Sequence, residues 1–184
     1  EFGAPTGGDP GAGWVNAQGG FKVNNVELVG VAAGTILQRV YAQTATYSGI
    51  STVIPYDNSI PQSSEGTQVL TVSITPKAAA NKLLVTITLQ VGSNSGLDAV
   101  VAALFKDSET GARAAASYMP TENRSGTATL AIQYEMTAGG TGAIDFKVRM
   151  GPGSTGDAYL NGDDSERKFG GLQVSSIVVT EVKI

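Results

Sequence analysis

The stretch LLVTITLQV, residues 83–91, decides the fold class of this chain. Its odd-numbered positions are all aliphatic, whereas the even-numbered ones are polar except for Leu84. Successive side chains of a β-strand point to opposite faces of a sheet, so this period of two predicts a strand with one buried and one solvated face. Such a strand needs neighbours to pair with, and the remaining sequence supplies them.

The same alternation recurs along the chain, in segments separated by Gly, Pro, Asn and Asp. Besides 83–91, the expected strands are Ile36–Tyr47, Leu70–Ile74, Val100–Phe105, Ala112–Tyr118, Leu130–Met136, Ile144–Met150 and Leu172–Val182. The alanines of 112–118 favour a helix, but that segment is too short to form a stable one. A change of parity near Ser175-Ser176 predicts a β-bulge in the last strand.

About eight antiparallel strands joined by turns predict an all-β fold, namely an antiparallel β-sandwich of the jelly-roll type. We place this sandwich at residues 34–184. Residues 14–33 precede it as a short stalk, in which Phe21–Leu28 forms a hairpin about two asparagines. Residues 1–13 are a Gly/Pro-rich flexible lead, whose first two residues, Glu1-Phe2, read as a cloning scar.

The composition of the chain argues against several classes of function. Its 184 residues carry a net charge of −4 and contain no Lys/Arg cluster, so we expect no nucleic-acid-binding face. The absence of cysteine and histidine removes disulfides, thiolate metal sites, the commonest general base and the commonest transition-metal ligand. No apolar run approaches the roughly 20 residues of a membrane helix. We therefore expect no enzyme, no cofactor or metal, and no membrane insertion.

The connection 151–170 is rich in Gly and Asp and contains the residues with the most obvious chemistry. Its start, 151–156, lacks the Gly-Lys-Ser/Thr ending of a phosphate loop. Asn161, Asp163 and Ser165 have the oxygen spacing of a calcium loop, but the glycine and glutamate that such a loop needs are replaced. The Asp and Glu residues of this connection could also supply the two carboxylates of a glycosidase, although acidic residues on a Gly-rich loop are normally solvated. We assign no catalytic or metal-binding residue here.

The long connections are expected to share one end of the sandwich. If each strand crosses the sandwich in turn, both termini and the short connections lie at one end. The connections 48–66, 92–97, 119–126 and 151–170 then lie at the other. Long loops far from the point of attachment are typical of a binding tip.

Aromatic rings with polar neighbours suit the recognition of sugars. Tyr159 is the best sugar-contact candidate because it stands beside Asn161 and Asp163. Tyr56, within a Pro-flanked segment, is expected to be structural instead. The candidate receptor-binding residues are Tyr118, Asn123, Arg124, Asp157, Tyr159, Asn161, Asp163 and Asp164.

Several motifs together resemble proteins of one family. They are Ile54-Pro55-Tyr56-Asp57-Asn58-Ser59-Ile60-Pro61-Gln62, Ala103-Leu104-Phe105-Lys106-Asp107, Glu135-Met136-Thr137, Phe146-Lys147-Val148-Arg149, Asn161-Gly162 and Thr180-Glu181, preceded by Asn16-Ala17-Gln18-Gly19-Gly20-Phe21-Lys22-Val23-Asn24. In this order they cover nearly the whole chain and resemble phage tail-fibre-like and prophage virion proteins. The resemblance implies a virion protein whose C-terminal domain ends a fibre, usually as a homotrimer. It implies no catalytic residues.

The sequence leaves three functions open. We expect the distal domain of a phage tail fibre or spike in the virion, which attaches to a host-surface glycan or protein and joins other virion proteins through its N-terminal side. The alternatives are a capsid fibre or decoration protein with a structural role, and a carbohydrate hydrolase. The apolar strand 100–105 and the isolated hairpin favour a homotrimer, with Val101, Ala103 and Phe105 at its interface. An interior strand of a thick sandwich has the same apolar pattern.

Overall fold

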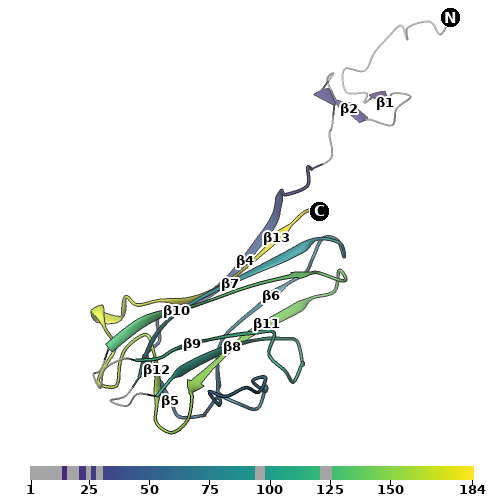
Figure 1. Ribbon diagram of the computed structural model, residues 1–184. Coiled ribbons are helices and arrows are strands. Elements are labelled where there is room, and N and C mark those ends of the chain that lie inside the picture. The colour runs from purple at the N-terminus through teal and green to yellow at the C-terminus, as the bar shows by residue number, and fades with distance from the viewer. Residues whose placement is uncertain (1–13, 16–20, 24–25, 28–30, 94–97, 121–125) are drawn as a thin grey trace, which may run out of the picture.

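The structure, a computed structural model, describes the chain apart from residues 1–13, 16–20, 24–25, 28–30, 94–97 and 121–125 (Figure 1). The described residues form strands and one 3-10 turn, η1 at Phe169–Gly171. The strands are β1 (Trp14–Val15), β2 (Phe21–Val23), β3 (Val26–Glu27), β4 (Ile36–Thr44), β5 (Ser48–Ile50), β6 (Thr67–Ile74), β7 (Lys82–Ser93), β8 (Val100–Lys106), β9 (Ala114–Tyr118), β10 (Gly126–Thr137), β11 (Ile144–Pro152), β12 (Ala158–Leu160) and β13 (Ser175–Val182). Within this part of the chain, no helix is long and apolar enough to cross a membrane.

Two antiparallel sheets stack to form the sandwich (Figure 1). The six-stranded sheet has the order β4-β13-β7-β12-β5, with β10 paired to the other edge of β7. The four-stranded sheet has the order β6-β11-β8-β9. The all-β antiparallel sandwich that the sequence predicts is therefore confirmed, and this strand order is consistent with a jelly roll.

The alternation in residues 83–91 places its aliphatic side chains in the core. The five odd-numbered residues of this stretch, all in β7, are at most 1% exposed. They share one core cluster with inward-facing residues of the four-stranded sheet, among them Leu104, Phe146 and Val148. Burial of one such side chain contributes about 1.5–3 kcal/mol. This alternation therefore supplies much of the attraction between the two sheets.

The two ends of the sandwich differ in what they carry. The backbone N–H of Gly34 donates to the carbonyl of Lys183 (2.7 Å), and that of Lys183 donates to the carbonyl of Thr35 (2.9 Å). We call this the terminal end, because the two flanks of the sandwich domain meet there (Figure 1). At the opposite, distal end, Ser93 of β7 pairs with Ala158 of β12. The connections that follow β11 and β12 lie at the distal end, as the sequence predicts.

The second face of β8 is covered by residues 51–66, which we call the cover segment. Ile54 of this segment is fully buried and packs with Val101, Ala103 and Phe105, which are 5%, 0% and 2% exposed. The expected interface residues are thus covered by their own chain and offer no surface to a neighbouring subunit. The interior-strand explanation, which the sequence left open, accounts for the apolar second face of β8.

Backbone hydrogen bonds hold the cover segment across the four-stranded sheet. The N–H of Ile54 donates to the carbonyl of Pro152, and the N–H of Ala112 donates to that of Pro61, both at 2.9 Å. Gly66 has a φ of 59°, and a Cβ there would lie 2.6 Å from Ile54 Cδ1. The expected position of 48–66 as a distal loop is therefore only partly right. Ile54 bonds to Pro152 at the distal end, whereas Pro61 lies against the turn between β8 and β9, so the segment also runs along the sheet.

Two further details depart from the sequence expectation. β13 begins at Ser175, and its odd-numbered residues face inward up to Glu181 without a change of parity. The predicted bulge near Ser175-Ser176 is wrong, because Leu172 and Val174 precede the strand as exposed residues, and the register shifts instead between Glu181 and Val182. The short strands β5 and β12 were not predicted, since three residues are too few to reveal a period.

The N-terminal segment forms a separate three-stranded sheet in the order β1-β2-β3. β2 pairs with β3 antiparallel, with Lys22 opposite Glu27 and Val23 opposite Val26. This is the predicted hairpin. Its two-asparagine turn and the lead at 1–13 lie outside the described residues.

Candidate functional site at the distal end

Two tyrosines come together where β5 and β12 pair at the distal end. Tyr47 directly precedes β5, and Tyr159 is the central residue of β12, opposite Gly49. The two rings are stacked, with centroids 6.1 Å apart and an angle of 5° between their planes. Aromatic pairs are favourable at centroid separations of about 4.5–7 Å. We call Tyr47 and Tyr159 the tyrosine pair.

Glycines beneath the rings make room for the tyrosine pair. A Cβ at Gly49 would lie 3.3 Å from Cε1 of Tyr159, and a Cβ at Gly162 would lie 2.7 Å from Cδ2 of Tyr47. A larger residue at Gly162 would therefore require the ring of Tyr47 or its surroundings to shift, whereas one at Gly49 would press on the ring of Tyr159 by a few tenths of an ångström. Because both side chains remain partly exposed, the pair forms a small aromatic surface at the distal end.

The turn after β12 is held by polar side chains. The hydroxyl of Tyr47 donates to the backbone carbonyl of Asp163 (2.8 Å). Asn161, which has a φ of 58°, donates through Nδ2 to the carbonyls of Thr44 and Thr46, each at 3.0 Å. Its Oδ1 accepts from the hydroxyl of Ser175 (2.8 Å). Asn161 therefore ties the turn after β12 to the segment before Tyr47, and its amide is not directed at a ligand.

Asp163 is likewise a structural residue. Its side chain accepts from the backbone N–H groups of Ser165 (3.0 Å) and Glu166 (3.2 Å) and pairs with Lys168 at 2.8 Å. Burial works against the charged form, but the hydrogen bonds from Lys168 and the backbone outweigh it and hold the pKa of Asp163 below its ordinary value. This carboxylate is engaged inside the turn, which disfavours its use in a glycosidase pair or as a calcium ligand.

The electrostatic environment of the tyrosine pair is negative. Burial raises the pKa of Tyr47, and the carboxylates of Asp163 and Asp164 raise it further. Burial likewise raises the pKa of Tyr159, with Asp157 as the next cause. Both phenols are therefore neutral at physiological pH. The hydroxyl of Tyr47 already donates to the carbonyl of Asp163, so the hydroxyl of Tyr159 is the donor that the pair offers beside the half-buried carboxylates of Asp157 and Asp164.

The structure keeps only part of the predicted receptor site together. Tyr159 belongs to the tyrosine pair, and Asp157 and Asp164 lie near it, whereas Tyr118 packs against the core from the end of β9. Asn161 and Asp163 are buried, and the predicted residues 123 and 124 (Asn123 and Arg124) lie outside the described residues. The sequence missed Tyr47, because it appears there only as the last residue of an alternating strand.

Tyr56 departs from its predicted structural role. Its backbone N–H bonds to the carbonyl of Gly153 (2.9 Å), but its side chain is 60% exposed. It lines a hollow of about 180 Å³ between the cover segment and β9. Tyr56 is therefore an exposed aromatic residue outside the tyrosine pair.

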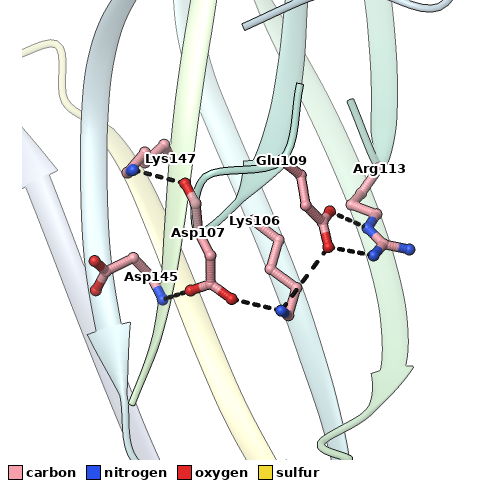
Figure 2. A network of polar contacts seen from close by, with 6 residues as sticks. All are labelled: Lys106, Asp107, Glu109, Arg113, Asp145 and Lys147. Atoms are coloured by element: carbon pink, nitrogen blue, oxygen red, sulfur yellow. Dashed lines mark hydrogen bonds and ion pairs between the residues drawn. The ribbon is translucent and has the colours of Figure 1, made fainter. Parts of the chain in front are cut away.

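A network of charged side chains links the β8–β9 turn to β11, as Figure 2 shows. Asp107, with a φ of 51°, accepts from Nζ of Lys106 (2.5 Å) and from the backbone N–H of Asp145 (2.8 Å). Nζ of Lys147 donates to its backbone carbonyl (2.7 Å). These polar groups find their partners within the network, which therefore stabilises the turn. Among the described residues, no group of three or more His, Cys, Asp or Glu residues is arranged to hold a metal ion.

No protein-family model matches the chain, and no curated protein sequence does. Among solved structures, it is similar to the C-terminal domain of EclA, a sugar-binding protein, with 12% identity and a TM-score of 0.36 over 89% of this chain and 88% of that chain. Eiger TNF from S. frugiperda is 15% identical, with a TM-score of 0.44 over 79% of this chain and 92% of that one. Dimeric latent PorU from Porphyromonas gingivalis is 11% identical, with a TM-score of 0.40 over 84% of this chain and 14% of that chain. Likenesses at this level carry over neither a ligand nor a partner.

Proposed function

We propose that this chain is the attachment domain of a virion fibre or spike and binds a host-surface glycan. The observation that carries this proposal is the tyrosine pair at the distal end, with Asp157 and Asp164 beside it. Flat rings bordered by hydrogen-bonding groups suit the apolar faces and hydroxyls of a sugar. The virion assignment is supported by the motifs that resemble tail-fibre-like proteins and by the terminal end, which leaves the distal end free to face a host.

The charge around the tyrosine pair favours a neutral glycan. Asp157 and Asp164 place negative potential at the phenol hydroxyls, and the whole chain has a net charge of −4. A sugar that carries carboxylate or phosphate groups would be repelled there. The hydroxyls of a neutral sugar, by contrast, can donate to these carboxylates. We therefore propose a neutral surface polysaccharide as the ligand class.

A glycan array that carries neutral and acidic bacterial polysaccharides tests this proposal. We expect binding to neutral glycans, which Tyr159→Ala weakens about tenfold or more, because truncation of a central aromatic contact commonly has effects of this size. Tyr159→Phe keeps the ring and should retain most of the binding. Tyr56→Ala is the matched control, since it removes an exposed ring outside the pair. Preference for acidic glycans, or loss of binding only in Tyr56→Ala, would contradict the proposed site.

The two alternative functions predict different results. A capsid fibre or decoration protein would bind no glycan on the array and would bind other virion proteins instead. A carbohydrate hydrolase would release reducing ends from the polysaccharides that it binds. We propose no catalytic role, because the Asp163 carboxylate is engaged by Lys168 and two backbone N–H groups.

A further inference from the structure

The outward face of the six-stranded sheet carries exposed apolar side chains. Residues that are paired across neighbouring strands line up in rows, and each row runs across β4, β13, β7 and β10. One row runs from Tyr41 through Val178 and Thr86 to Gln133. Cross-strand neighbours lie on the same face of a sheet, so each row forms a continuous strip. Tyr41, at the start of this row, is a large ring that is 66% exposed.

Each of the two neighbouring rows adds one large exposed apolar side chain among polar ones. The next row towards the terminal end runs from Arg39 through Thr180 and Leu84 to Glu135, and Leu84 is 38% exposed. The row after it begins with Ile36, which is 63% exposed. We call the surface formed by these three rows the row face. Exposed apolar side chains gathered on one sheet face are typical of a surface that is covered by a partner.

The two edges of the row face complement each other. Arg39 on β4 and Glu135 on β10 end the same row at opposite edges and carry opposite charges. The β10 edge also has a hollow of about 350 Å³, which Leu84, Thr86 and Gln133 help to line. The protruding ring of Tyr41 stands at the other edge, two residues from Arg39. One edge therefore offers a ring and a cation, and the other offers a hollow and an anion.

We propose that copies of this chain pack side by side through the row face, with the β4 edge of one copy against the β10 edge of the next. Tyr41 then enters the hollow beside β10, and Arg39 joins Glu135, which already pairs with Lys82 at 3.3 Å. The occupant of the row face is a second copy of this chain. Such head-to-tail contacts close into a ring when the rotation between copies is right.

The shared row determines the direction of the symmetry axis. Because Arg39 and Glu135 lie in one row, they stand at the same level along the strands. A rotation about an axis parallel to the strands preserves that level and brings the two residues together. It also places the terminal ends of all copies on one side, as a fibre requires. This interface replaces the one that was expected at β8, and it does not depend on the glycan site.

Light scattering coupled to size-exclusion chromatography of the full chain tests the interface. We expect a defined oligomer. Its mass is roughly three times the 18.8 kDa of one chain if the ring is the homotrimer that the resemblance to tail-fibre-like proteins implies. Leu84→Glu, Arg39→Glu and Glu135→Arg should each weaken association about tenfold or more, since like charges then face each other or a charge is buried. The double variant Arg39→Glu/Glu135→Arg should restore the oligomer.

A control on the other sheet separates this effect from general loss of fold. Thr71→Glu adds a charge to an exposed position of β6 and should leave the mass unchanged. Circular dichroism melts of every variant establish that it is folded. A wild-type monomer at all concentrations would overturn the proposal and leave the row face to another partner. An oligomer that survives Leu84→Glu, or a double variant that fails to reassemble, would also overturn it.

Discussion

Glu181 is a fully buried charge at the terminal end of the sandwich. Its carboxylate accepts from Nε2 of Gln38 (2.6 Å), Nδ2 of Asn81 (2.6 Å) and the backbone N–H groups of Lys77 (2.7 Å) and Ala78 (3.4 Å). Burial works against the charged form, but these hydrogen bonds outweigh it and hold the pKa of Glu181 below its ordinary value. One side chain thereby joins β13 to β4 and to the turn before β7.

Replacement of this carboxylate by an amide should destabilise the domain. We expect Glu181→Gln to lower the free energy of unfolding by about 2–4 kcal/mol, because its NH₂ group would face donors in a buried site. Urea denaturation measures this change. Glu166→Gln, at a side chain that is 72% exposed, is the matched control and should change the free energy little. Equal effects of the two substitutions would contradict this role.

The same carboxylate predicts a pH dependence with a definite sign. The pKa of Glu181 is lower in the folded protein than its ordinary value of 4.5, which it has in the unfolded chain. The charged carboxylate therefore stabilises the fold fully at pH values above 4.5. That contribution is lost as the pH falls below 4.5 towards the folded pKa. The difference in unfolding free energy between the wild type and Glu181→Gln should therefore shrink in this range. A difference that stays constant below pH 4.5 would show that the carboxylate does not titrate in this way.

At the distal end, some residues of the candidate site could be predicted from the sequence and others could not. Tyr159 was predicted as a sugar contact because polar residues follow it closely, and the structure places it in the tyrosine pair. Tyr47 could not be predicted, since its contact with Tyr159 arises only when β5 and β12 pair. Asn161 and Asp163 were predicted as receptor contacts but are buried, because a sequence does not reveal whether a polar side chain faces solvent or its own turn.

At the scale of elements, period-two alternation predicted the strands that carry the core. Strands β6, β7, β8, β10 and β11 coincide with predicted segments. What covers β8 could not be predicted, because its apolar second face is explained equally by a neighbouring subunit or by a distant segment. Ile54 and Phe105 meet only through the cover segment, and no local pattern encodes that contact.

The cover segment should contribute to stability through Ile54. This side chain is fully buried against the second face of β8, so Ile54→Ala should lower the free energy of unfolding by about 2–5 kcal/mol. Ile60→Ala changes the same residue type in the same segment at a position that is 64% exposed, and should have little effect. Chemical denaturation compares the two. A small effect of Ile54→Ala would mean that the cover segment packs only loosely.

At the scale of the whole molecule, three surfaces are distinct from one another. The terminal end holds the two flanks of the domain together, the distal end carries the tyrosine pair, and the row face lies along the side between them. An axis parallel to the strands would direct the distal ends of all copies the same way. A ring of such copies would then present several glycan sites to one host surface.

This arrangement predicts that assembly strengthens attachment to a surface without changing the individual site. Linked sites raise the avidity for a multivalent surface by about 10²–10⁴ over a single site. We therefore expect the wild type to bind an immobilised neutral polysaccharide far more tightly than Leu84→Glu does. Both proteins should bind a short soluble oligosaccharide of the same glycan equally, because Leu84 lies on the row face, away from the tyrosine pair.

Surface plasmon resonance on the immobilised polysaccharide and calorimetry with the oligosaccharide separate the two proposals. If Leu84→Glu is monomeric and binds the polysaccharide as tightly as the wild type, the copies do not present their sites together, and the direction of the axis is wrong. If Tyr159→Ala loses the oligosaccharide but keeps the wild-type mass, the glycan site is supported independently of assembly. Tyr159→Ala should also lose the immobilised polysaccharide, since avidity multiplies the affinity of single sites and cannot replace it.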